Sequence, residues 1–390
     1  MTTVPTTLGF VMPPAVRLAD SAGFEVTLAS SAAREDAARA GFKSVVVPMK
    51  RGFGLDGLNA IVALYRVFRR NRFDIVQYST PNAALYSSIA AWLARVPVRV
   101  YAQWGIRYVG LSGVARLAVK LAERLVCALS TTVEPDSQGN LDFSVAEGLY
   151  PREKGFVHWN GSAAGVDLTK FNADVRAAFR AEERSRLGIP KSSFVVGFVG
   201  RLSRDKGGNE LLWAARSLMA RGYDIRLMLV GSMEADDVDP RLLSWAEGER
   251  RVIKVDWVDD VPRAMAAMDV LALPSYREGF GSVVIEAEAL GIPVIVSEIP
   301  GPLDAMVPGE TGLAVPKGDA RALVTAVAEL IKSPNKALEM GRAGATFAAE
   351  RFERGALCAS IVERRVAQVS SRGRREPAER AMAQRGEVRS

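Results

Sequence analysis

Short, strongly apolar runs alternate with longer segments of helical periodicity along almost the whole chain. In the front half the runs are FEVTLASS, KSVVVPM, FDIVQYS and VPVRVYAQ. Such runs, rich in β-branched residues and bounded by turn residues, are typical of strands buried on both faces. The segments between them have the length of helical crossovers, so the pattern predicts a doubly wound α/β domain with a parallel sheet.

The back half repeats the same scheme. Its apolar runs are SFVVGFVG, IRLMLVGS, RVIKVDWV, DVLALPS and PVIVSE. Helices are expected between them, for example over residues 209–221 and 319–332, the second with Asp319 as its N-cap. The chain is therefore predicted to contain two Rossmann-like domains.

The composition changes at three places that we interpret as boundaries. We expect a front domain over residues 1–165 and a back domain over residues 166–350, with a linker near 161–171. A helix over 351–370 is expected to pack back on the front domain, and residues 371–390 are expected to form a disordered basic tail. The opening MTTVPTTLGF leaves room for a stubby first strand only, unless Met1 is not the biological start.

The overall composition fits two globular domains and no membrane span. The chain has 390 residues, of which 48% are hydrophobic. The first twenty residues do not resemble a signal peptide, and the longest uncharged run, residues 75–94, is interrupted by Pro81. Cys127 and Cys358 are far apart in apolar helical patterns, which predicts buried thiols in a reducing cytoplasm.

The positive charge is concentrated in the front half. The net charge is +7, and residues 1–165 hold 18 basic and 12 acidic side chains. Much of this excess lies on two predicted amphipathic helices, residues 58–72 and 111–129, which favours an anionic membrane or a phosphate-bearing acceptor as partner. Aromatic residues are only 7%, and no basic stretch is interleaved with them, so nucleic-acid binding is an alternative that the sequence disfavours.

The stretch YREGFGSVVIEAEALG follows the buried run DVLALPS, at the edge of the sheet where open α/β sheets bind ligands. Its two glutamates, Glu278 in the loop and Glu286 in the helix, suit hydrogen bonds to a sugar and to a ribose diol. Backbone amides at the glycine-rich turn suit a phosphate. The residues of this turn are Gly279, Phe280, Gly281, Ser282 and Val283. The alternative is that both glutamates are ordinary polar residues.

A second loop, GFVGRLSRDKGG, follows the first strand of the back half and carries Arg201 and Lys206. Parallel topology brings its two cations to the same edge as Glu278. The loop matches neither the Walker pattern nor G-x-G-x-x-G, which argues against ATP or NAD as ligand.

Together these motifs resemble the family 4 retaining glycosyltransferases of the GT-B fold. The resemblance is strongest in FVGRLSRDKG, DVLALPSYREGFGSVVIEAEALGIPVI and GPLDAMVPGETGLAVPKGD. It implies two Rossmann-like domains facing across a crevice, and a nucleotide-diphosphate sugar, with uridine the first expected base and guanosine the second, held by the back domain. Arg201 and Lys206 would contact the diphosphate, Glu278 and the glycine-rich turn the sugar and phosphate, and Glu286 the ribose.

The front half is similar to members that build capsule, exopolysaccharide or O-antigen units of lipopolysaccharide on a lipid carrier. This resemblance implies a polyprenyl-diphosphate-linked or saccharide acceptor bound by the front domain. The basic helices of the front half predict a cytoplasmic enzyme that is peripheral at the inner face of the cytoplasmic membrane. A sugar-nucleotide epimerase of the same fold is the nearest alternative, because it would bind the same kind of donor.

The sequence departs from the family pattern at one position. Where many members have His-Gly, this chain has Trp104 before Gly105, and Trp104 is expected to stack on a sugar face. The only histidine of the sequence, His158, is assigned no role. Catalysis is therefore expected to rest on Arg201 and Lys206, which would stabilise the leaving diphosphate, with Glu278 beside the donor sugar. The donor's own phosphate would take the acceptor proton.

No metal or other cofactor is predicted besides the nucleotide-sugar co-substrate. Asp237-Val238-Asp239 matches the D-x-D pattern that holds a divalent ion in another glycosyltransferase architecture. Asp239 precedes Pro240, however, and an N-cap followed by proline is the common interpretation of that pair. The two cations would supply the charge that a metal supplies elsewhere.

Overall fold

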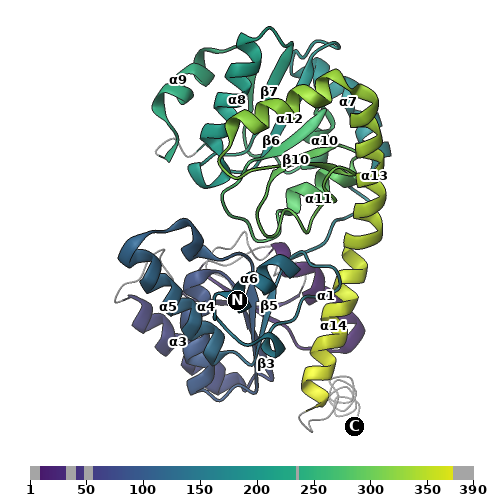
Figure 1. Ribbon diagram of the computed structural model, residues 1–390. Helices are drawn as coiled ribbons and strands as arrows, with labels where there is room; N and C mark the ends of the chain where they lie inside the picture. Colours follow the sequence, from purple (N-terminus) through teal and green to yellow (C-terminus); the bar gives the residue numbers. More distant parts are fainter. Residues whose placement is uncertain (1–8, 32–40, 48–55, 234–236, 372–390) are drawn as a thin grey trace. The chain divides into compact units, whose positions relative to one another are not determined.

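A computed structural model describes residues 9–31, 41–47, 56–233 and 237–371 of the chain (Figure 1). The chain divides into two compact units. Unit 1 comprises Met1–Ala164 and Gly355–Ser390, and unit 2 comprises Gly165–Arg354. Residues 1–8, which hold most of the questioned first strand, and residues 372–390 of the expected basic tail lie outside the described residues.

Unit 2 is built on one six-stranded parallel sheet in the order β11-β10-β9-β6-β7-β8. Its strands are β6 (Phe194–Val199), β7 (Ile225–Val230), β8 (Val252–Val255), β9 (Val270–Leu273), β10 (Val294–Ser297) and β11 (Gly312–Val315). The five predicted strands are confirmed. Strand β11 was not predicted, because GLAV is short and its middle residues are only half-buried at the edge of the sheet.

Helices cover both faces of this sheet. They are α7 (Ala173–Arg186), α8 (Gly208–Ala220), α9 (Pro240–Gly248), α10 (Val261–Ala266), α11 (Ser282–Ala289), α12 (Ala320–Lys332) and α13 (Pro334–Phe352). Helix α8 packs against α9 and α12, while α11 packs against α13 (Figure 1). The predicted N-cap is confirmed, since the Asp319 carboxylate accepts hydrogen bonds from the amides of Arg321 and Ala322.

Unit 1 contains five described strands, and every pair is parallel. They are β1 (Thr27–Ser30), β2 (Lys43–Val46), β3 (Ile75–Tyr78), β4 (Val98–Gln103) and β5 (Thr132–Pro135). In the described part of this unit they form two sheets, β1-β2 and β3-β4-β5. The four predicted strands are confirmed. Strand β5 was not predicted because TTVEP contains a glutamate and a proline, which an edge strand tolerates.

The helices of unit 1 are α1 (Met12–Ala22), α3 (Asp56–Asn71), α4 (Pro81–Leu93), α5 (Gly113–Leu129), α6 (Gln138–Ala146) and α14 (Arg354–Ser370). Helix α4 packs between α3 and α5 (Figure 1). Helix α14 is attached to unit 1 through ion pairs of Arg365 with Glu134 and a hydrogen bond from Arg17 to the Gly355 carbonyl. Residues 355–370 of the last helix therefore belong to the first unit.

Each unit has its own hydrophobic core. In unit 2 the core includes Phe198 and Phe280, and in unit 1 it includes Tyr78 and Leu64. Cys127 and Cys358 are buried free thiols, as predicted. No helix in the described part of the chain is both long enough and apolar enough to cross a membrane.

Candidate active site

Two loops of unit 2 meet at the carboxyl edge of its sheet. The first follows β6 and carries the exposed Arg201 and then Lys206, which ends a 3-10 turn. The second follows β9 and carries Glu278. Gly207 has a φ of 73°, and a Cβ atom at this position would lie 2.0 Å from the carbonyl oxygen of Pro274. A glycine is therefore required for the two loops to come together.

Lys206 and Glu278 form an ion pair across these loops. The Lys206 ammonium donates hydrogen bonds to both carboxylate oxygens of Glu278, at 2.6 and 2.7 Å. The buried hydroxyl of Ser275 donates a third bond to Glu278 Oε1, at 2.7 Å. The Glu278 side chain is only 8% exposed, so most of this carboxylate is shielded from solvent.

Further polar contacts tie the two loops together. The amide of Tyr276 donates to the Asp205 carbonyl at 2.8 Å, and Arg277 forms an ion pair with the Asp205 carboxylate. The Tyr276 hydroxyl donates to Glu210 Oε1 at 2.7 Å. Sequence reasoning missed these contacts, although opposite charges on two loops at one sheet edge were a usable signal. They hold Lys206 and Glu278 in a defined geometry.

Helix α11 begins at this site, directly after Gly281. Its N-cap, Gly281, has a φ of 83° and provides no side-chain hydrogen bond to the helix. The amides of Ser282 and Val283 at the start of α11 therefore suit an anion. Phe280 contributes differently, because its side chain is 2% exposed and packs edge-on against Phe352 at 5.1 Å. Any contact of Phe280 with a ligand would come from its backbone.

Two glutamates of α11 lie in poorly solvated surroundings. Burial raises the pKa of Glu286 to about 7, opposed by the nearby positive charge of Arg354. Burial raises the pKa of Glu288 to about 9, opposed only in part by the nearby Thr311. Among the described residues, neither carboxyl oxygen of Glu288 has a hydrogen-bond partner. Glu288 is therefore a buried neutral acid, whereas Glu286 titrates near neutral pH.

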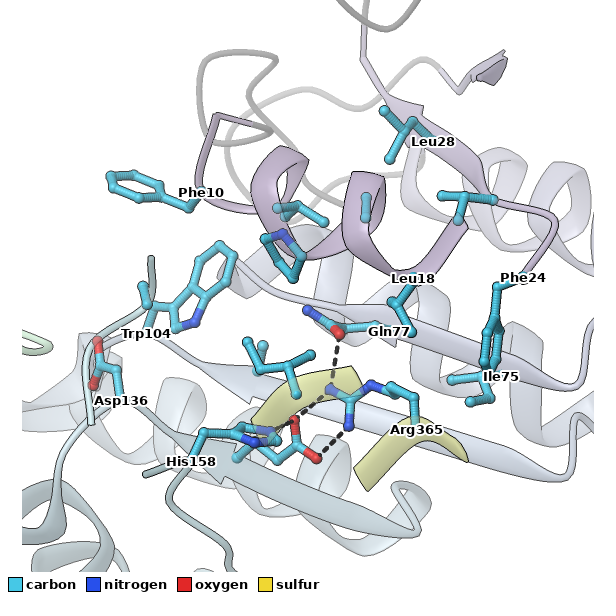
Figure 2. A pocket seen from close by; sticks show the side chains of 18 of the residues that line it. Phe10, Leu18, Phe24, Leu28, Ile75, Gln77, Trp104, Asp136, His158 and Arg365 are labelled. Carbon is cyan, nitrogen blue, oxygen red and sulfur yellow. Dashed lines mark hydrogen bonds and ion pairs between the residues drawn. The ribbon is translucent and has the colours of Figure 1, made fainter. Parts of the chain in front are cut away.

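The remaining predicted site residues, Trp104 and Gly105, belong to unit 1. They follow β4, where Trp104 lines a cavity and packs edge-on against Phe10 at a ring distance of 5.9 Å (Figure 2). Side chains from α1, β1, β3, β5 and α14 complete the lining. The structure thus brings Lys206, Glu278 and the start of α11 together in unit 2, and it places Trp104 in a largely apolar pocket of unit 1.

A buried charged cluster forms one wall of that cavity (Figure 2). Arg365 of α14 pairs with Glu134 at the end of β5, at 2.5 Å, and donates to Gln77 at 2.9 Å. His158 Nε2 lies 2.9 Å from Glu134 Oε2. Burial alone would raise the pKa of Glu134, but Arg365 and His158 outweigh it and hold the pKa well below its usual range. His158 is therefore part of a buried polar network.

The D-x-D match has a structural explanation. The Asp239 carboxylate accepts a hydrogen bond from the Arg241 amide at 2.8 Å and caps α9, which begins at Pro240. The described residues contain no group of three His, Cys, Asp or Glu side chains that could hold a metal ion. Asp239 is thus a helix cap, as its sequence context indicates.

Comparison with known proteins identifies the family of the chain. The family described as "Glycosyl transferases group 1" matches residues 179–347, and the "Glycosyl transferase 4-like domain" matches residues 14–161. The capsular polysaccharide biosynthesis glycosyltransferase CapM of Staphylococcus aureus is 31% identical over 77% of this chain and 78% of its own length. The chain therefore belongs to the group 1 glycosyltransferases and is an enzyme of that class.

Other relatives match over shorter regions. A UDP-Gal:alpha-D-GlcNAc-diphosphoundecaprenol alpha-1,3-galactosyltransferase of Escherichia coli is 28% identical over 63% of this chain and 62% of its own length. A D-inositol 3-phosphate glycosyltransferase of Arthrobacter sp. is 35% identical over 50% of this chain. The matched region spans 46% of that protein's length.

Solved structures confirm the fold. Anabaena Alr3699/HepE in complex with UDP matches with a TM-score of 0.75 and 21% identity, covering 93% of this chain and 97% of that one. WaaG, a glycosyltransferase involved in lipopolysaccharide biosynthesis, matches with a TM-score of 0.74 and 17% identity, with the same coverage. The predicted GT-B architecture and glycosyltransferase class are confirmed, and the epimerase alternative is set aside.

Proposed function

We propose that this glycosyltransferase moves a hexosyl group from a UDP-sugar to a lipid-linked or saccharide acceptor during the synthesis of a cell-surface polysaccharide. The observation that carries the proposal is the Lys206–Glu278 pair beside the uncapped start of α11. The relatives support it, since CapM is named for capsular polysaccharide biosynthesis and the Escherichia coli enzyme for UDP-Gal and a diphosphoundecaprenol acceptor. HepE has been solved with UDP and with UDP-glucose.

The donor is proposed to bind unit 2. An ammonium group has three donors, and Glu278 accepts only two of those of Lys206, so the third remains for a diphosphate oxygen. Arg201 would add a second cation, and the amides from Gly279 to Val283 would bind a phosphate oxygen or the sugar. Glu286 would accept hydrogen bonds from the ribose. Unit 1, with Trp104 and Gly105, would bind the acceptor.

The proposed chemistry is electrostatic. Negative charge grows on the diphosphate as the bond to the sugar breaks, and Arg201 and Lys206 would stabilise that charge. Glu278 would hold Lys206 in place and contact the donor sugar. A donor phosphate oxygen would take the acceptor proton on the face that the diphosphate leaves, which gives retention of configuration. We propose no metal in these steps, because the two cations serve the purpose that a metal would serve.

The donor can be identified by protection against unfolding. A nucleotide sugar present at a hundred times its dissociation constant should stabilise the protein by about 2.7 kcal/mol. We expect UDP-sugars to protect the wild type and to protect Lys206→Ala much less. Arg221→Ala, which removes an exposed cation at the opposite end of α8, is the matched control. Equal protection of all three proteins would contradict the assigned donor site.

The basic residues of α3 and α5 suggest a location at the inner face of the cytoplasmic membrane. Arg66, Arg69 and Arg70 are exposed on α3, and Arg116 and Arg124 are exposed on α5. Each basic residue near an anionic surface contributes about 1 kcal/mol, which salt screens. Binding to anionic vesicles should therefore fall with added salt. No nucleic-acid partner is proposed.

A further inference from the structure

Trp104 and Asp136 lie side by side at the carboxyl edge of the β3-β4-β5 sheet in unit 1. Gln103 of β4 pairs with Pro135 of β5 in parallel register, and Trp104 and Asp136 are the residues that directly follow this pair. Neighbouring strands are about 4.8 Å apart. An indole ring and a carboxylate therefore lie close together at one end of the cavity that both residues line (Figure 2).

Asp136 is a buried carboxylate that the proposed chemistry does not use. The residue is 5% exposed, and its carboxylate accepts a hydrogen bond from the Asn140 side chain at 3.3 Å. Helix α6 begins two positions later, and its cap is Ser137, whose hydroxyl accepts from the Asn140 amide at 3.1 Å. Asp136 is therefore not the cap of this helix. An ionised carboxylate can accept about four hydrogen bonds, so Asp136 can bind hydroxyl groups of a ligand as well as Asn140.

The turn over residues 159–162 lies against Asp136. The Ser162 amide donates a hydrogen bond to the Asp136 carbonyl at 2.6 Å, and Ser162 lines the same cavity. Trp159 and Ser162 have φ angles of 49° and 77°, in the left-handed region that non-glycine residues seldom adopt. Strained residues of this kind are often found at ligand sites, where surrounding contacts hold them in place. The backbone conformation therefore adds a second reason to expect a ligand beside Asp136.

The basic side chains of the cavity are already paired. Arg365 donates to both carboxylate oxygens of Glu134, at 2.7 and 2.5 Å, and His158 Nε2 lies 2.9 Å from the same carboxylate. Among the described residues that line the cavity, Arg365 and His158 are the only basic ones. A phosphate group would therefore be repelled by Asp136 without meeting an unpaired cation. The hydroxyl groups of an uncharged sugar, by contrast, would donate hydrogen bonds to Asp136.

We propose that Trp104 and Asp136 bind the terminal sugar of the acceptor and that this sugar is uncharged. The indole ring would stack on the C–H face of the sugar ring, while the Asp136 carboxylate would accept hydrogen bonds from its hydroxyl groups. This inference rests on the proposed transferase function and narrows its acceptor. The attacking group is a sugar hydroxyl, and a lipid phosphate is not an acceptor. Asp136 is thus a specificity-determining residue of unit 1.

The first test compares acceptor chemistries with the wild type and a UDP-sugar that protects it from unfolding. Octyl glycosides of glucose, galactose and N-acetylglucosamine present sugar hydroxyls, whereas a polyprenyl phosphate in detergent presents a phosphate. We expect transfer to at least one octyl glycoside and no transfer to the polyprenyl phosphate. Transfer to the polyprenyl phosphate, or to none of these compounds, would overturn the proposal.

The second test separates acceptor binding from donor binding and from the stability of the protein. Water can replace the acceptor, so slow hydrolysis of the UDP-sugar reports the donor site and the fold. With the best octyl glycoside, Asp136→Asn and Trp104→Ala should each lower kcat/KM at least about tenfold, while hydrolysis changes less than about twofold. Trp104→Phe should retain most of the activity, because a phenyl ring still stacks. Asp142→Asn, which changes an exposed carboxylate on α6, is the matched control and should behave like wild type.

Two results of this second test would contradict the acceptor subsite. One is a parallel loss of transfer and hydrolysis in Asp136→Asn, and the other is transfer equal to wild type in either Asp136→Asn or Trp104→Ala. The proposed function is tested separately, because it predicts that the wild type binds and hydrolyses a UDP-sugar at unit 2. Failure of the wild type with every UDP-sugar would count against that function, whereas normal hydrolysis with either of the two results would overturn the subsite alone.

Discussion

Lys206 donates hydrogen bonds to both carboxylate oxygens of Glu278, although the two residues are 72 positions apart in the chain. The pair neutralises a carboxylate that is almost buried, and it fixes a cation at the carboxyl edge of the sheet. Each residue therefore depends on the other for its position. The Lys206–Glu278 ion pair is therefore the central element of the proposed donor site.

The first prediction concerns the stability of that pair. Glu278→Ala leaves Lys206 and the buried Ser275 hydroxyl without their acceptor, which should lower the free energy of unfolding by about 1–3 kcal/mol. A cost of this size is expected because the Glu278 side chain is only 8% exposed. Denaturant unfolding of Glu278→Ala, Lys206→Met and the double variant would measure the coupling. If the two single substitutions lower the free energy of unfolding by amounts that add up in the double variant, the two side chains do not interact.

A second prediction follows from the raised pKa of Glu286. If its carboxylate accepts hydrogen bonds from the ribose, binding favours the ionised form, so affinity for UDP-glucose should rise as the pH increases through about 7. Glu286→Gln should bind more weakly at high pH and lose this pH dependence, while turnover changes less. Calorimetric titrations between pH 6 and pH 8 would show the difference. An unchanged pH profile in the variant would remove Glu286 from the ribose site.

The third prediction concerns Glu288. Its pKa is about 9 in the folded protein and near the usual 4.5 after unfolding, so between these values the folded state binds more protons. The free energy of unfolding should therefore fall as the pH rises from about 4.5 to about 9, by up to about 1.4 kcal/mol per pH unit from this group. Glu288→Met should flatten that slope and raise stability at pH 8. A slope identical to that of wild type would show that Glu288 does not stay protonated.

A fourth prediction addresses metal dependence. Because Arg201 and Lys206 are proposed to supply the positive charge at the diphosphate, transfer should continue after extensive treatment with EDTA. Adding back magnesium or manganese should change the rate by less than about twofold. A loss of activity that a divalent ion restores would show that the two cations are not sufficient.

The sequence predicted the fold well where the physical signal is local. The buried runs that form β6, β7, β9 and β10 are continuous and apolar, and Asp319 caps its helix as its position indicates. Strand β5 was not predicted because Glu134 and Pro135 are unusual in strands, and Glu134 is accommodated by His158 and, from the last helix, by Arg365. That compensation comes from a residue 231 positions away.

The sequence predicted which residues form the candidate site, but it did not predict which of them contact each other. Motifs identified Lys206 and Glu278 separately, but their pairing depends on the close approach of two loops that Gly207 permits. The orientation of α5 was not predictable either. Its periodicity indicates an amphipathic helix, yet in the structure Glu123 lies on the buried face and Leu117 and Leu121 are exposed.

The most direct test of the proposed donor site is turnover in folded variants of the two cations. With the correct UDP-sugar and acceptor, Arg201→Ala and Lys206→Ala should each lower the rate constant of transfer about a hundredfold, equivalent to on the order of 3 kcal/mol of transition-state stabilisation. Donor affinity should fall much less, because the charge that they meet grows as the bond breaks. Near wild-type transfer in both variants, with Arg221→Ala as the charge-matched control, would contradict the assignment of this site.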